Sequence, residues 1–372
     1  MGHVCSRIKE KIMLEDFDLK AAVEPLLKWY EKNKRELPWR SQATPYRVWV
    51  SEIMLQQTRV EAVKPYFARF MEALPDIQAL AQCPQDRLLK LWEGLGYYNR
   101  VRNMQEAART VMEKYQGVMP ADYEALLSLK GIGSYTAGAV ASIAYGLSVP
   151  AVDGNVLRVL MRLTEDDSDI MKQSVRKRTE KALARIMPEG RAGDLNQGLM
   201  ELGATVCVPN GAPRCEICPW GDMCLARAHG TFDRLPVKSK GKPRKIQEKT
   251  VLIIRDQDRV ILRQREKKGL LAGMYEFPNE EGLLTPEEAL QKVREMNLHP
   301  MRIRKLEDAR HIFSHVEWHM TGYMIQVDSL TREESGMLFV EIKETEKKYA
   351  IPAAFGAYTK YLDLRIGNEK YE

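Results

Sequence analysis

The chain has 372 residues, and at about 150 residues per domain this length predicts two domains. Hydrophobic residues make up 44% of the sequence and charged residues 29%, a balance that excludes a disordered chain, a collagen-like repeat and a disulfide-rich scaffold. Lys and Arg number 57 against 51 Asp and Glu, so the formal net charge is +6. This mild basic excess is compatible with a polyanionic partner such as nucleic acid.

The sequence shows no signal for secretion or membrane insertion. No apolar run reaches the length of about 18 residues that a spanning helix needs, and residues 136–152 predict a buried helix followed by a turn. The first residues, MGHVCSRIKEKIMLEDF, lack the apolar core of a signal peptide. We therefore expect a soluble cytoplasmic protein, associated with the nucleoid if its partner is DNA.

The first part of the chain predicts an all-helical domain. Between residues 19 and about 228, apolar residues recur three and four positions apart with short connections between the runs, as in helices that share one core. Two runs show this spacing clearly: Val60, Val63, Phe67 and Phe70, and then Val156, Val159, Leu160 and Leu163.

Two polar segments inside this domain carry candidate chemistry. A continuous helix over residues 51–59 (SEIMLQQTR) would place Glu52, Gln56 and Arg59 on one face. A carboxylate at such a place is often only solvated, but in a cleft its pKa would rise and it could serve as a general acid. In residues 152–155 (VDGN), Asp153 taken alone is more typical of a helix N-cap or a turn.

Two further segments suit contact with nucleic acid. Residues 129–133 (LKGIG) space two glycines by one residue, so backbone N–H groups can approach a phosphate with a helix N-terminus behind them. Residues 92–100 (WEGLGYYNR) set paired tyrosines close to an arginine. This pattern fits either aromatic packing at a helix end or a wedge that enters a base stack.

Four of the six cysteines lie within 18 residues, with the spacing C-x7-C-x2-C-x5-C: Cys207, Cys215, Cys218 and Cys224. A large chain without a secretion signal keeps its thiols reduced, so this density indicates metal ligation rather than disulfides. Zinc and a 4Fe–4S cluster both accept four thiolates, and the spacing leans only slightly toward the cluster. Four unliganded core cysteines are the third alternative.

The character of the sequence changes after residue 236. Residues 236–249 (PVKSKGKPRKIQEK) hold six Lys or Arg and one acidic residue, which is typical of a basic linker. Residues 250–256 and 259–266 then predict two strands joined at Gln257 and Asp258. Thr285, Pro286 and Glu288 predict a capped helix start, residues 318–327 a further strand, and residues from about 352 a short helix. The second domain is therefore expected to be α+β.

Taken in order, these motifs resemble the MutY family of adenine DNA glycosylases, within the helix–hairpin–helix superfamily. The similarity extends over nearly the whole chain and rests on an ordered set of segments: 37–40 (LPWR), 49–60, 94–100, 129–155, the four cysteines and 313–315 (FSH). The implied fold is an all-α N-terminal helix–hairpin–helix glycosylase domain with a cysteine-ligated cluster, followed by an α+β Nudix-like domain. The implied boundaries are 10–230, a linker at 231–248, and 249–366, with the iron–sulfur loop at 207–224.

The resemblance implies a reaction and the residues that perform it. Family members remove adenine mispaired with 8-oxoguanine or guanine, after flipping the adenine out of the duplex. Glu52 matches the acid that protonates adenine at N7, and Asp153 matches the carboxylate that stabilises the resulting sugar cation. Tyr135 and Asn155 match residues that organise these two acids.

The remaining implied roles concern DNA and the cofactor. Trp39, Arg40 and Leu55 match the adenine pocket. The wedge around the opposite base is matched by Gln57, Thr58, Leu95 and Tyr97. Gly131 and Gly133 match the hairpin. The four cysteines match the ligands of a 4Fe–4S cluster, although the family usually spaces the first two by six residues and this chain by seven. The implied partner is double-stranded DNA with an A:8-oxoguanine or A:G mispair, bound by a monomer.

The C-terminal domain resembles a Nudix fold at residues 269–271 (GLL) and 275–278 (YEFP), but its catalytic box is missing. The metal-binding helix would fall near residues 289–298 (ALQKVREMNL), where one glutamate stands in place of the several carboxylates that magnesium needs. The resemblance implies that this domain reads 8-oxoguanine through Phe313, Ser314 and His315. Without the resemblance, these three residues would indicate a turn at a strand end.

Three other functions compete with this interpretation. A bifunctional glycosylase and AP lyase similar to endonuclease III needs a lysine amine for a Schiff base, and Tyr135 stands where that relative has its lysine. A Nudix-type nucleotide hydrolase is disfavoured by the missing box. A non-catalytic DNA-binding protein is disfavoured because the two matched acids and the two residues matched to organise them are all present.

Overall fold

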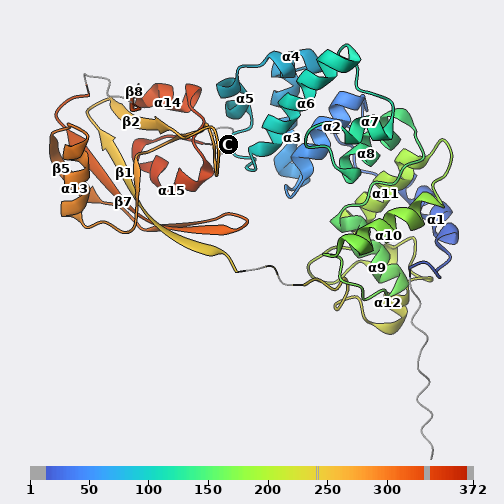
Figure 1. Ribbon diagram of the computed structural model, residues 1–372. Coiled ribbons are helices and arrows are strands. Elements are labelled where there is room, and N and C mark those ends of the chain that lie inside the picture. Colours follow the sequence, from blue (N-terminus) through green and yellow to red (C-terminus); the bar gives the residue numbers. More distant parts are fainter. Residues whose placement is uncertain (1–13, 240, 242, 331–335, 367–372) are drawn as a thin grey trace, which may run out of the picture. The chain divides into compact units, whose positions relative to one another are not determined.

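The computed structural model describes residues 14–239, 241, 243–330 and 336–366 (Figure 1). These residues form two compact units. The first comprises the described residues of Met1–Met71, Asp76–Ala81 and Glu106–Lys240, and the second those of Glu72–Pro75, Gln82–Gln105 and Gly241–Glu372. The N-terminal segment that we read as lacking a signal peptide lies mostly outside the described residues. Within the described part of the chain, no helix is long and apolar enough to cross a membrane.

All regular elements among the described residues of the first unit are helices. In chain order they are α1 (Leu19–Asn33), α2 (Pro45–Leu55), α3 (Val60–Ala73), α4 (Ile77–Gln82), the end of α6 (Asn99–Tyr115), α7 (Tyr123–Leu127), α8 (Ser134–Tyr145), α9 (Gly154–Thr164), α10 (Gln173–Ala184), α11 (Ala192–Thr205), the 3₁₀ turn η1 (Cys215–Ile217) and α12 (Leu225–His229). This confirms the predicted run of helices.

The predicted apolar faces form the core of this unit. Every residue of α9 from Val156 to Thr164 is buried, and the α3 face at Val63, Phe67 and Phe70 is buried as well. α11 packs against α1, α8 and α9, and α2 packs against α8. The burial of apolar surface between these helices brings the ends of α2, α8 and α9 into one region of the unit.

The expected continuous helix over residues 51–59 is wrong. α2 ends at Leu55, and Gln57 has a positive φ of 60°, which an α-helix cannot contain. α3 starts at Val60. Glu52 therefore lies inside the last turns of α2, whereas Gln56 and Arg59 belong to the turn between the two helices and do not share a helical face with it.

The segment before Asp153 is held by two close contacts. Gly138 of α8 approaches the backbone of Pro150 so closely that a Cβ atom on Gly138 would lie 2.2 Å from the Pro150 carbonyl oxygen. The buried side chain of Asn196, in α11, accepts a hydrogen bond from the Ala151 N–H at 3.0 Å and donates to the Val149 carbonyl at 2.9 Å. These contacts fix the path of the chain into α9.

The second unit contains an eight-stranded sheet flanked by helices. Its helical elements are α5 (Gln85–Leu91), the start of α6, α13 (Pro286–Glu295), α14 (Ile342–Lys348), η2 (Ala353–Phe355), α15 (Gly356–Thr359) and η3 (Lys360–Leu362). Its strands are β1 (Lys245–Arg255), β2 (Arg259–Gln264), β3 (Tyr275–Glu276), β4 (Asn279–Glu281), β5 (Pro300–Lys305), β6 (Ala309–Ile312), β7 (Val316–Val327) and β8 (Leu338–Glu341). The main strand order is β3-β2-β1-β7-β5, and β1 runs parallel to β7.

Alternating residues of β1 supply the two faces of the sheet, as the period of two along a strand requires. Val251 and Ile253 pack into a core with Trp318 and Phe355. Leu252 and Ile254 pack on the other side with residues of α13. Both faces are therefore covered, so β1 reads as a continuous apolar run.

Several predicted elements of this unit are confirmed. β1 and β2 form the expected antiparallel hairpin, with Arg255 opposite Val260. Thr285 caps α13, and Glu288 completes the capping box. β7 and the short C-terminal helical elements lie where the sequence predicts them.

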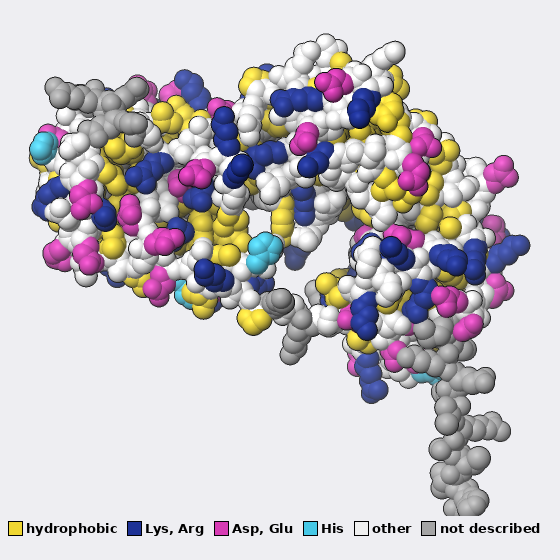
Figure 2. Space-filling view, in the orientation of Figure 1, with side chains coloured by type: hydrophobic (Ala, Val, Ile, Leu, Met, Phe, Trp, Pro, Cys, Tyr) yellow, Lys and Arg dark blue, Asp and Glu magenta, His cyan; other side chains and the backbone are white. Residues whose placement is uncertain are grey.

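The C-terminal bound of the predicted linker, 231–248, is wrong. β1 begins at Lys245, and residues 245–248 pair in parallel with residues 316–319 of β7. At the other end, the Leu235 and Val237 carbonyls accept hydrogen bonds from Arg162 and the Ile170 N–H. Backbone pairing therefore fixes both ends of the segment. On the face shown in Figure 2, basic and acidic side chains are interspersed in both units, so charge is spread over that face.

The close approach of Gly138 predicts the effect of adding one methyl group. Gly138→Ala should lower the free energy of unfolding by about 1–3 kcal/mol, because the new Cβ forces the Pro150 backbone away from α8. Gly154→Ala is the matched control, since Gly154 begins α9 and has no atom within 4 Å of an added Cβ. Urea unfolding of both variants measures the difference, and equal stability of the two would contradict the packing argument.

Candidate functional site

Glu52 is a buried carboxyl on α2, with only 6% of its surface exposed. The Tyr135 hydroxyl, in the first turn of α8, donates a hydrogen bond to Glu52 Oε2. Burial raises the pKa of Glu52 to about 7, and the nearby Asp153 carboxylate adds to the rise. The Tyr135 hydrogen bond and the charge of Arg40 oppose it. Glu52 therefore exchanges its proton near neutral pH.

Asp153 is the N-cap of α9, the position that its sequence context predicts. Its Oδ1 accepts the Val156 backbone N–H at 2.8 Å, and its Oδ2 accepts the Asn155 Nδ2–H at 2.9 Å. Burial raises the pKa of Asp153, while these hydrogen bonds and the charge of Arg158 lower it. The N-terminal end of the helix dipole also favours the ionised form.

The two carboxyls share a region from which water is largely excluded, so ionising both at once is costly. Asp153 has two N–H donors, a helix N-terminus and a nearby guanidinium, whereas Glu52 has one phenolic donor. The first negative charge is therefore best placed on Asp153 and the remaining proton on Glu52. This division gives the site one acid and one anion.

A chain of hydrogen bonds leads from Asp153 to the cysteine segment. Asn155, which donates to Asp153, accepts a hydrogen bond from Arg158 Nη2 at 2.8 Å. The same nitrogen donates to the Gly203 carbonyl, and Arg158 Nε donates to the Cys207 carbonyl at 2.9 Å. Arg158 therefore fixes Asn155 to the end of α11 and to the first of the four clustered cysteines.

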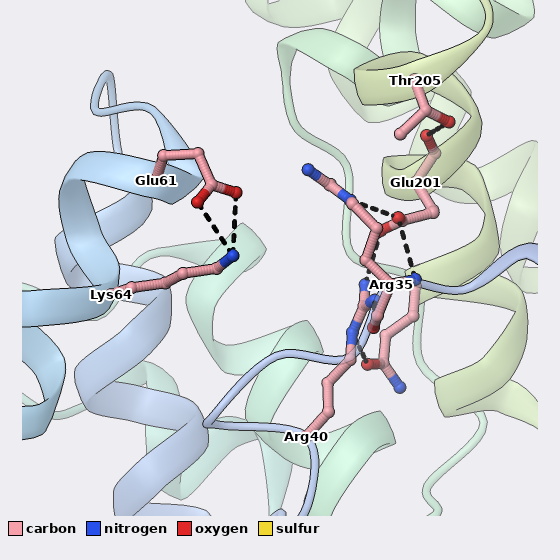
Figure 3. Close-up of polar contacts among 7 residues, drawn as sticks. Arg35, Arg40, Glu61, Lys64, Glu201 and Thr205 are labelled. Atoms are coloured by element: carbon pink, nitrogen blue, oxygen red, sulfur yellow. Dashed lines mark hydrogen bonds and ion pairs between the residues drawn. The ribbon is translucent and has the colours of Figure 1, made fainter.

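A second polar network surrounds Glu201 of α11 and is shown in Figure 3. Only 1% of the Glu201 side chain is exposed, and it accepts hydrogen bonds from Arg35 Nε at 2.5 Å and Arg40 Nη2 at 2.8 Å. Arg40 also donates to Gln197 Oε1 at 3.1 Å and to the Arg35 carbonyl at 2.9 Å. The two arginines lower the pKa of Glu201, even though burial opposes them.

Sequence reasoning missed Glu201, Arg35, Gln197 and Arg158. Gln197 and Glu201 are polar residues four positions apart in an otherwise apolar helical run, a spacing that puts them on one helical face. That pattern could have marked a buried polar network. Their partners on the loop after α1 are far away in the sequence, so only the fold brings them together.

The other residues matched to the adenine pocket lie on α2 or just before it. Trp39 is buried and packs edge-on against Phe67 at 5.4 Å between ring centroids. Leu55 is the last residue of α2, and Gln57 and Thr58 follow in the turn, with Gln57 exposed. The charge of Arg40 affects Glu52 directly. Gln57 and Thr58 thus lie in the turn after α2, five and six residues after Glu52.

The glycine pair forms the predicted turn at the start of α8. Gly131 has a positive φ of 77°, a conformation that favours glycine, and Gly133 is the N-cap of α8. Ile132 between them is buried and anchors the turn, with its N–H donating to the Leu129 carbonyl at 3.1 Å. The exposed glycines leave N–H groups of a helix N-terminus accessible to a phosphate.

In the second unit, Tyr97 lies beside the turn that carries Ser314. Tyr97 has 49% of its surface exposed and a positive φ of 49°, while Leu95 is buried. Phe313, Ser314 and His315 form the turn between β6 and β7, closed by the Phe313 N–H to the Val316 carbonyl at 2.8 Å. The Ser314 hydroxyl donates to the Tyr97 hydroxyl at 3.4 Å.

The four clustered cysteines line one pocket that is partly open to solvent. All four thiols are free, and Arg162 Nη1 donates to Cys207 Sγ at 3.4 Å. Burial raises the pKa of Cys218 to about 12, and it also raises the pKa values of Cys215 and Cys224. The fold thus places the four cysteines of the predicted ligand set around one pocket.

The spacing of the four thiols bears on which kind of metal centre they can hold. Two thiolates on one tetrahedral zinc ion lie about 3.8 Å apart, because each Zn–S bond is about 2.3 Å long. Among the described residues, no three His, Cys, Asp or Glu side chains lie close enough to hold a single metal ion. Four thiols that line one pocket but lie too far apart to share a single ion fit a larger centre, such as a 4Fe–4S cluster, with one thiolate at each corner.

Comparison with known proteins identifies the family. Residues 50–185 match the HhH-GPD superfamily of base excision DNA repair proteins, and residues 250–361 match the NUDIX domain. The chain is 33% identical to the adenine DNA glycosylase of Buchnera aphidicola subsp. Acyrthosiphon pisum (strain APS), across 81% of this chain and 85% of that protein. The chain belongs to the adenine DNA glycosylase family.

Two further relatives agree with this assignment. The adenine DNA glycosylase of Homo sapiens is 34% identical, across 82% of this chain and 67% of the human protein. A solved structure of a thermostable thymine-DNA glycosylase is 29% identical, with a TM-score of 0.51 over 56% of this chain and 96% of that one. Membership in the adenine DNA glycosylase family confirms the predicted fold class, a helical glycosylase domain followed by a Nudix-like domain.

The raised pKa of Glu52 predicts how this family member's stability depends on pH. The folded state binds the Glu52 proton more tightly than an ordinary glutamate of pKa 4.5 does. The contribution of Glu52 to stability is therefore fully present below pH 4.5 and is lost as pH rises toward 7. Glu52→Gln removes the buried charge, so its stability relative to the parent should improve by about 3 kcal/mol between pH 4.5 and pH 8. Urea unfolding at both pH values measures this change, and a pH-independent difference would contradict it.

Proposed function

We propose that this protein excises adenine from A:8-oxoguanine or A:G mispairs in duplex DNA by hydrolysis of the N-glycosidic bond. As a member of the adenine DNA glycosylase family it is a DNA N-glycosylase of base excision repair, and DNA is its partner. The observation that carries the proposal is the pairing of Glu52, whose pKa is raised to about 7, with Asp153, whose charge is supported by a helix N-terminus.

Glu52 supplies the proton in the proposed reaction. Adenine flipped out of the base stack would meet a carboxyl that still carries its proton in much of the population near neutral pH. Protonation at N7 lets adenine depart as a neutral leaving group. Tyr135 holds the Glu52 carboxyl through Oε2 and is itself held near Met200, whose sulfur accepts from the hydroxyl at 3.6 Å. The second Glu52 oxygen then carries the proton toward the base.

Asp153 stabilises the positive sugar that departure of the base leaves behind. Its two oxygens are oriented by Val156 and Asn155, and Arg158 orients Asn155 in turn. An anion next to an oxocarbenium-like sugar lowers the barrier to C–N cleavage, and the same carboxylate can bond to the sugar carbon. Water then completes hydrolysis, with the ionised Glu52 as general base.

Lyase chemistry is disfavoured by the residue at position 135. A Schiff base with the sugar needs a lysine amine, whereas the first turn of α8 presents a tyrosine whose hydroxyl is bonded to Glu52. Burial and the two carboxylates raise the pKa of Tyr135 well above its ordinary value, so the phenol stays protonated and does not act as a nucleophile. The proposed enzyme is therefore monofunctional and leaves an abasic site.

The turn of Phe313, Ser314 and His315 is the proposed reader of the base opposite adenine. Phe313 is fixed by ring contacts with His311 at 4.7 Å and Trp318 at 4.9 Å, which leaves the exposed Ser314 and His315 at the tip of the turn. Tyr97 meets Ser314 from the segment matched to the wedge. A serine hydroxyl can accept a hydrogen bond from the extra N–H of 8-oxoguanine, which guanine lacks.

We also propose that Cys207, Cys215, Cys218 and Cys224 hold a 4Fe–4S cluster. The support is the single pocket that all four thiols line, the absence of a single-ion site among the described residues, and the Arg162 guanidinium, which donates to Cys207 Sγ. When bound, the cluster would supply a rigid cross-link of the loop between α11 and α12. Arg158, which donates to the Cys207 carbonyl, connects this loop to Asn155.

A single-turnover assay tests the proposed reaction on duplexes with adenine opposite 8-oxoguanine, guanine or thymine. Excision should occur opposite the first two bases, and strand breaks should appear only after alkali. Glu52→Gln and Asp153→Asn should each lower the excision rate by about 10²–10⁴-fold, because the first cannot donate a proton and the second cannot support the sugar cation. Mismatch binding, measured by gel shift, should survive both changes.

Glu61→Gln is the matched control for the acid, since Glu61 is an exposed glutamate on the neighbouring α3. Its excision rate should equal that of the parent. Excision by Glu52→Gln within tenfold of the parent rate would overturn its role as general acid. Strand cleavage without alkali or heat would overturn the monofunctional assignment.

The cluster proposal predicts the metal content of the purified protein. Anaerobically purified protein should be brown and contain about four irons per chain. Cys218→Ser should lose iron and thermal stability together, whereas Cys83→Ser, a buried thiol outside the cavity, should keep the iron. Colourless protein with one zinc per chain would show that the centre is a zinc site instead.

A further inference from the structure

Glu93 is a buried carboxylate that the proposed reaction does not use. Only 4% of its surface is exposed, and it lies in the second unit between α5 and the wedge residue Tyr97. Glu93 Oε1 accepts the backbone N–H of Ile351 at 2.9 Å and a hydrogen bond from Lys90 Nζ at 3.0 Å. Lys90 Nζ also donates to the Tyr349 carbonyl at 2.5 Å. One ion pair therefore binds two points of the segment 349–351.

Further contacts of the same kind lie on both sides of this ion pair. Before it, Asp86 accepts hydrogen bonds from the Tyr275 hydroxyl at 3.3 Å and from Gln264 Nε2 at 3.4 Å. After it, Arg102 donates to the Ala272 carbonyl. The segment from α5 to the start of α6 is thus fastened to the sheet and its loops along its length, and Lys90 and Glu93 are the buried centre of this attachment.

The segment 349–351 packs in the same core as the turn that carries Ser314. Ile351 is buried in the core that also contains Trp318 and Phe355, whose rings lie 6.0 Å apart. Phe313 packs on Trp318 at 4.9 Å, and its neighbour Ser314 donates to the Tyr97 hydroxyl. Contacts therefore connect Glu93 through Ile351 and this core to Ser314, and Ser314 contacts Tyr97, which is four residues after Glu93 in the chain.

We infer that Lys90 and Glu93 form a latch that sets the position of Tyr97 relative to Ser314, so that both meet the base opposite adenine. Glu93 is then a positioning residue for recognition of that base, and the inference rests on the proposed function. A buried charge whose partners are removed is strongly disfavoured, so the latch holds only when the Ile351 N–H and the Lys90 amine are both in place. Tyr97 is exposed and needs such external support to keep one position.

The chain offers a matched control for the latch. Glu61 and Lys64 of α3 form an ion pair with the same three-residue spacing, at 2.9 Å, and are drawn in Figure 3. Their side chains are 76% and 36% exposed, against 4% and 15% for Glu93 and Lys90. An exposed pair of this kind contributes little, because water screens it. Any effect of the latch that is not shared by this pair comes from its buried contacts.

The test is the ratio of single-turnover excision rates for A:8-oxoguanine and A:G duplexes, measured with the full-length protein. A loss of general stability or of the chemical step affects both substrates and cancels in the ratio. Glu93→Ala and Lys90→Met should each lower the ratio by about tenfold, the size expected for hydrogen bonds to a buried charge. Glu93→Gln keeps an acceptor for the Ile351 N–H and should retain most of the ratio, and Glu61→Ala should retain all of it.

A double variant connects the latch to the reader. Ser314→Ala removes the proposed contact with 8-oxoguanine and should lower the ratio by itself. If the latch acts through Ser314 and Tyr97, adding Glu93→Ala to Ser314→Ala should lower the ratio no further. Additive losses, an unchanged ratio in Glu93→Ala, or an equal drop for both substrates would each overturn the inference. If Glu93→Ala fails to fold, Lys90→Met and Glu93→Gln decide the same question.

Amide hydrogen exchange separates failure of the latch from failure of the proposed specificity. If the parent enzyme shows no preference for 8-oxoguanine, the proposed specificity fails, and the latch is judged by exchange alone. Peptides covering 94–100 and 349–355 should then exchange faster in Glu93→Ala than in Glu61→Ala. Equal exchange in these two variants would overturn the latch.

Discussion

The structure of the candidate site depends on one electrostatic constraint: two carboxyls share a buried region that favours a single negative charge. Burial raises the pKa values of both Glu52 and Asp153, and the Asp153 carboxylate adds to the rise at Glu52. The helix N-terminus and two N–H donors at Asp153 decide which of them is ionised. The close contact of Gly138 with Pro150 and the hydrogen bonds of Asn196 fix the position of Asp153. The packing of α8, α9 and α11 therefore sets where the negative charge lies.

Arginines hold the polar groups near the site in place: Arg158 is buried, and Arg35 and Arg40 are partly buried. Arg158 satisfies Asn155 and the Gly203 and Cys207 carbonyls, and Arg35 and Arg40 neutralise Glu201. Each guanidinium has several donors in a fixed plane, so one arginine can hold two or three elements in register. The residues around Asp153 are therefore bonded to the cysteine loop, and a change in that loop would alter the position of the carboxylate through Arg158 and Asn155.

The second unit shows how a fold can keep its packing while its site changes. Its sheet has buried side chains on both faces, and α13 is capped as its sequence predicts. Yet residues 289–298 carry one glutamate, whereas a metal-dependent Nudix hydrolase needs several carboxylates there. The polar groups of interest lie instead at the turn between β6 and β7 and on the segment 86–102. In this unit the sheet serves as a rigid support for a loop and a neighbouring helix end.

Periodicity, capping residues and cysteine spacing are local patterns, and they were enough to predict the helical first unit, the sheet-containing second unit and the group of four cysteines. The catalytic roles of Glu52 and Asp153 came from the resemblance of the ordered motifs to a known family. The sequence also placed Asp153 at a helix N-terminus. It did not show that α2 ends at Leu55, because residues 51–59 carry no glycine or proline that would mark the turn at Gln57, whose φ is positive. The ion pairs of Glu201 with Arg35 and Arg40, and the hydrogen bond from the Ile351 N–H to Glu93, form only in the folded chain. Those pairs are separated by 160 residues or more, and their contacts arise from the packing of whole helices and strands rather than from any local pattern.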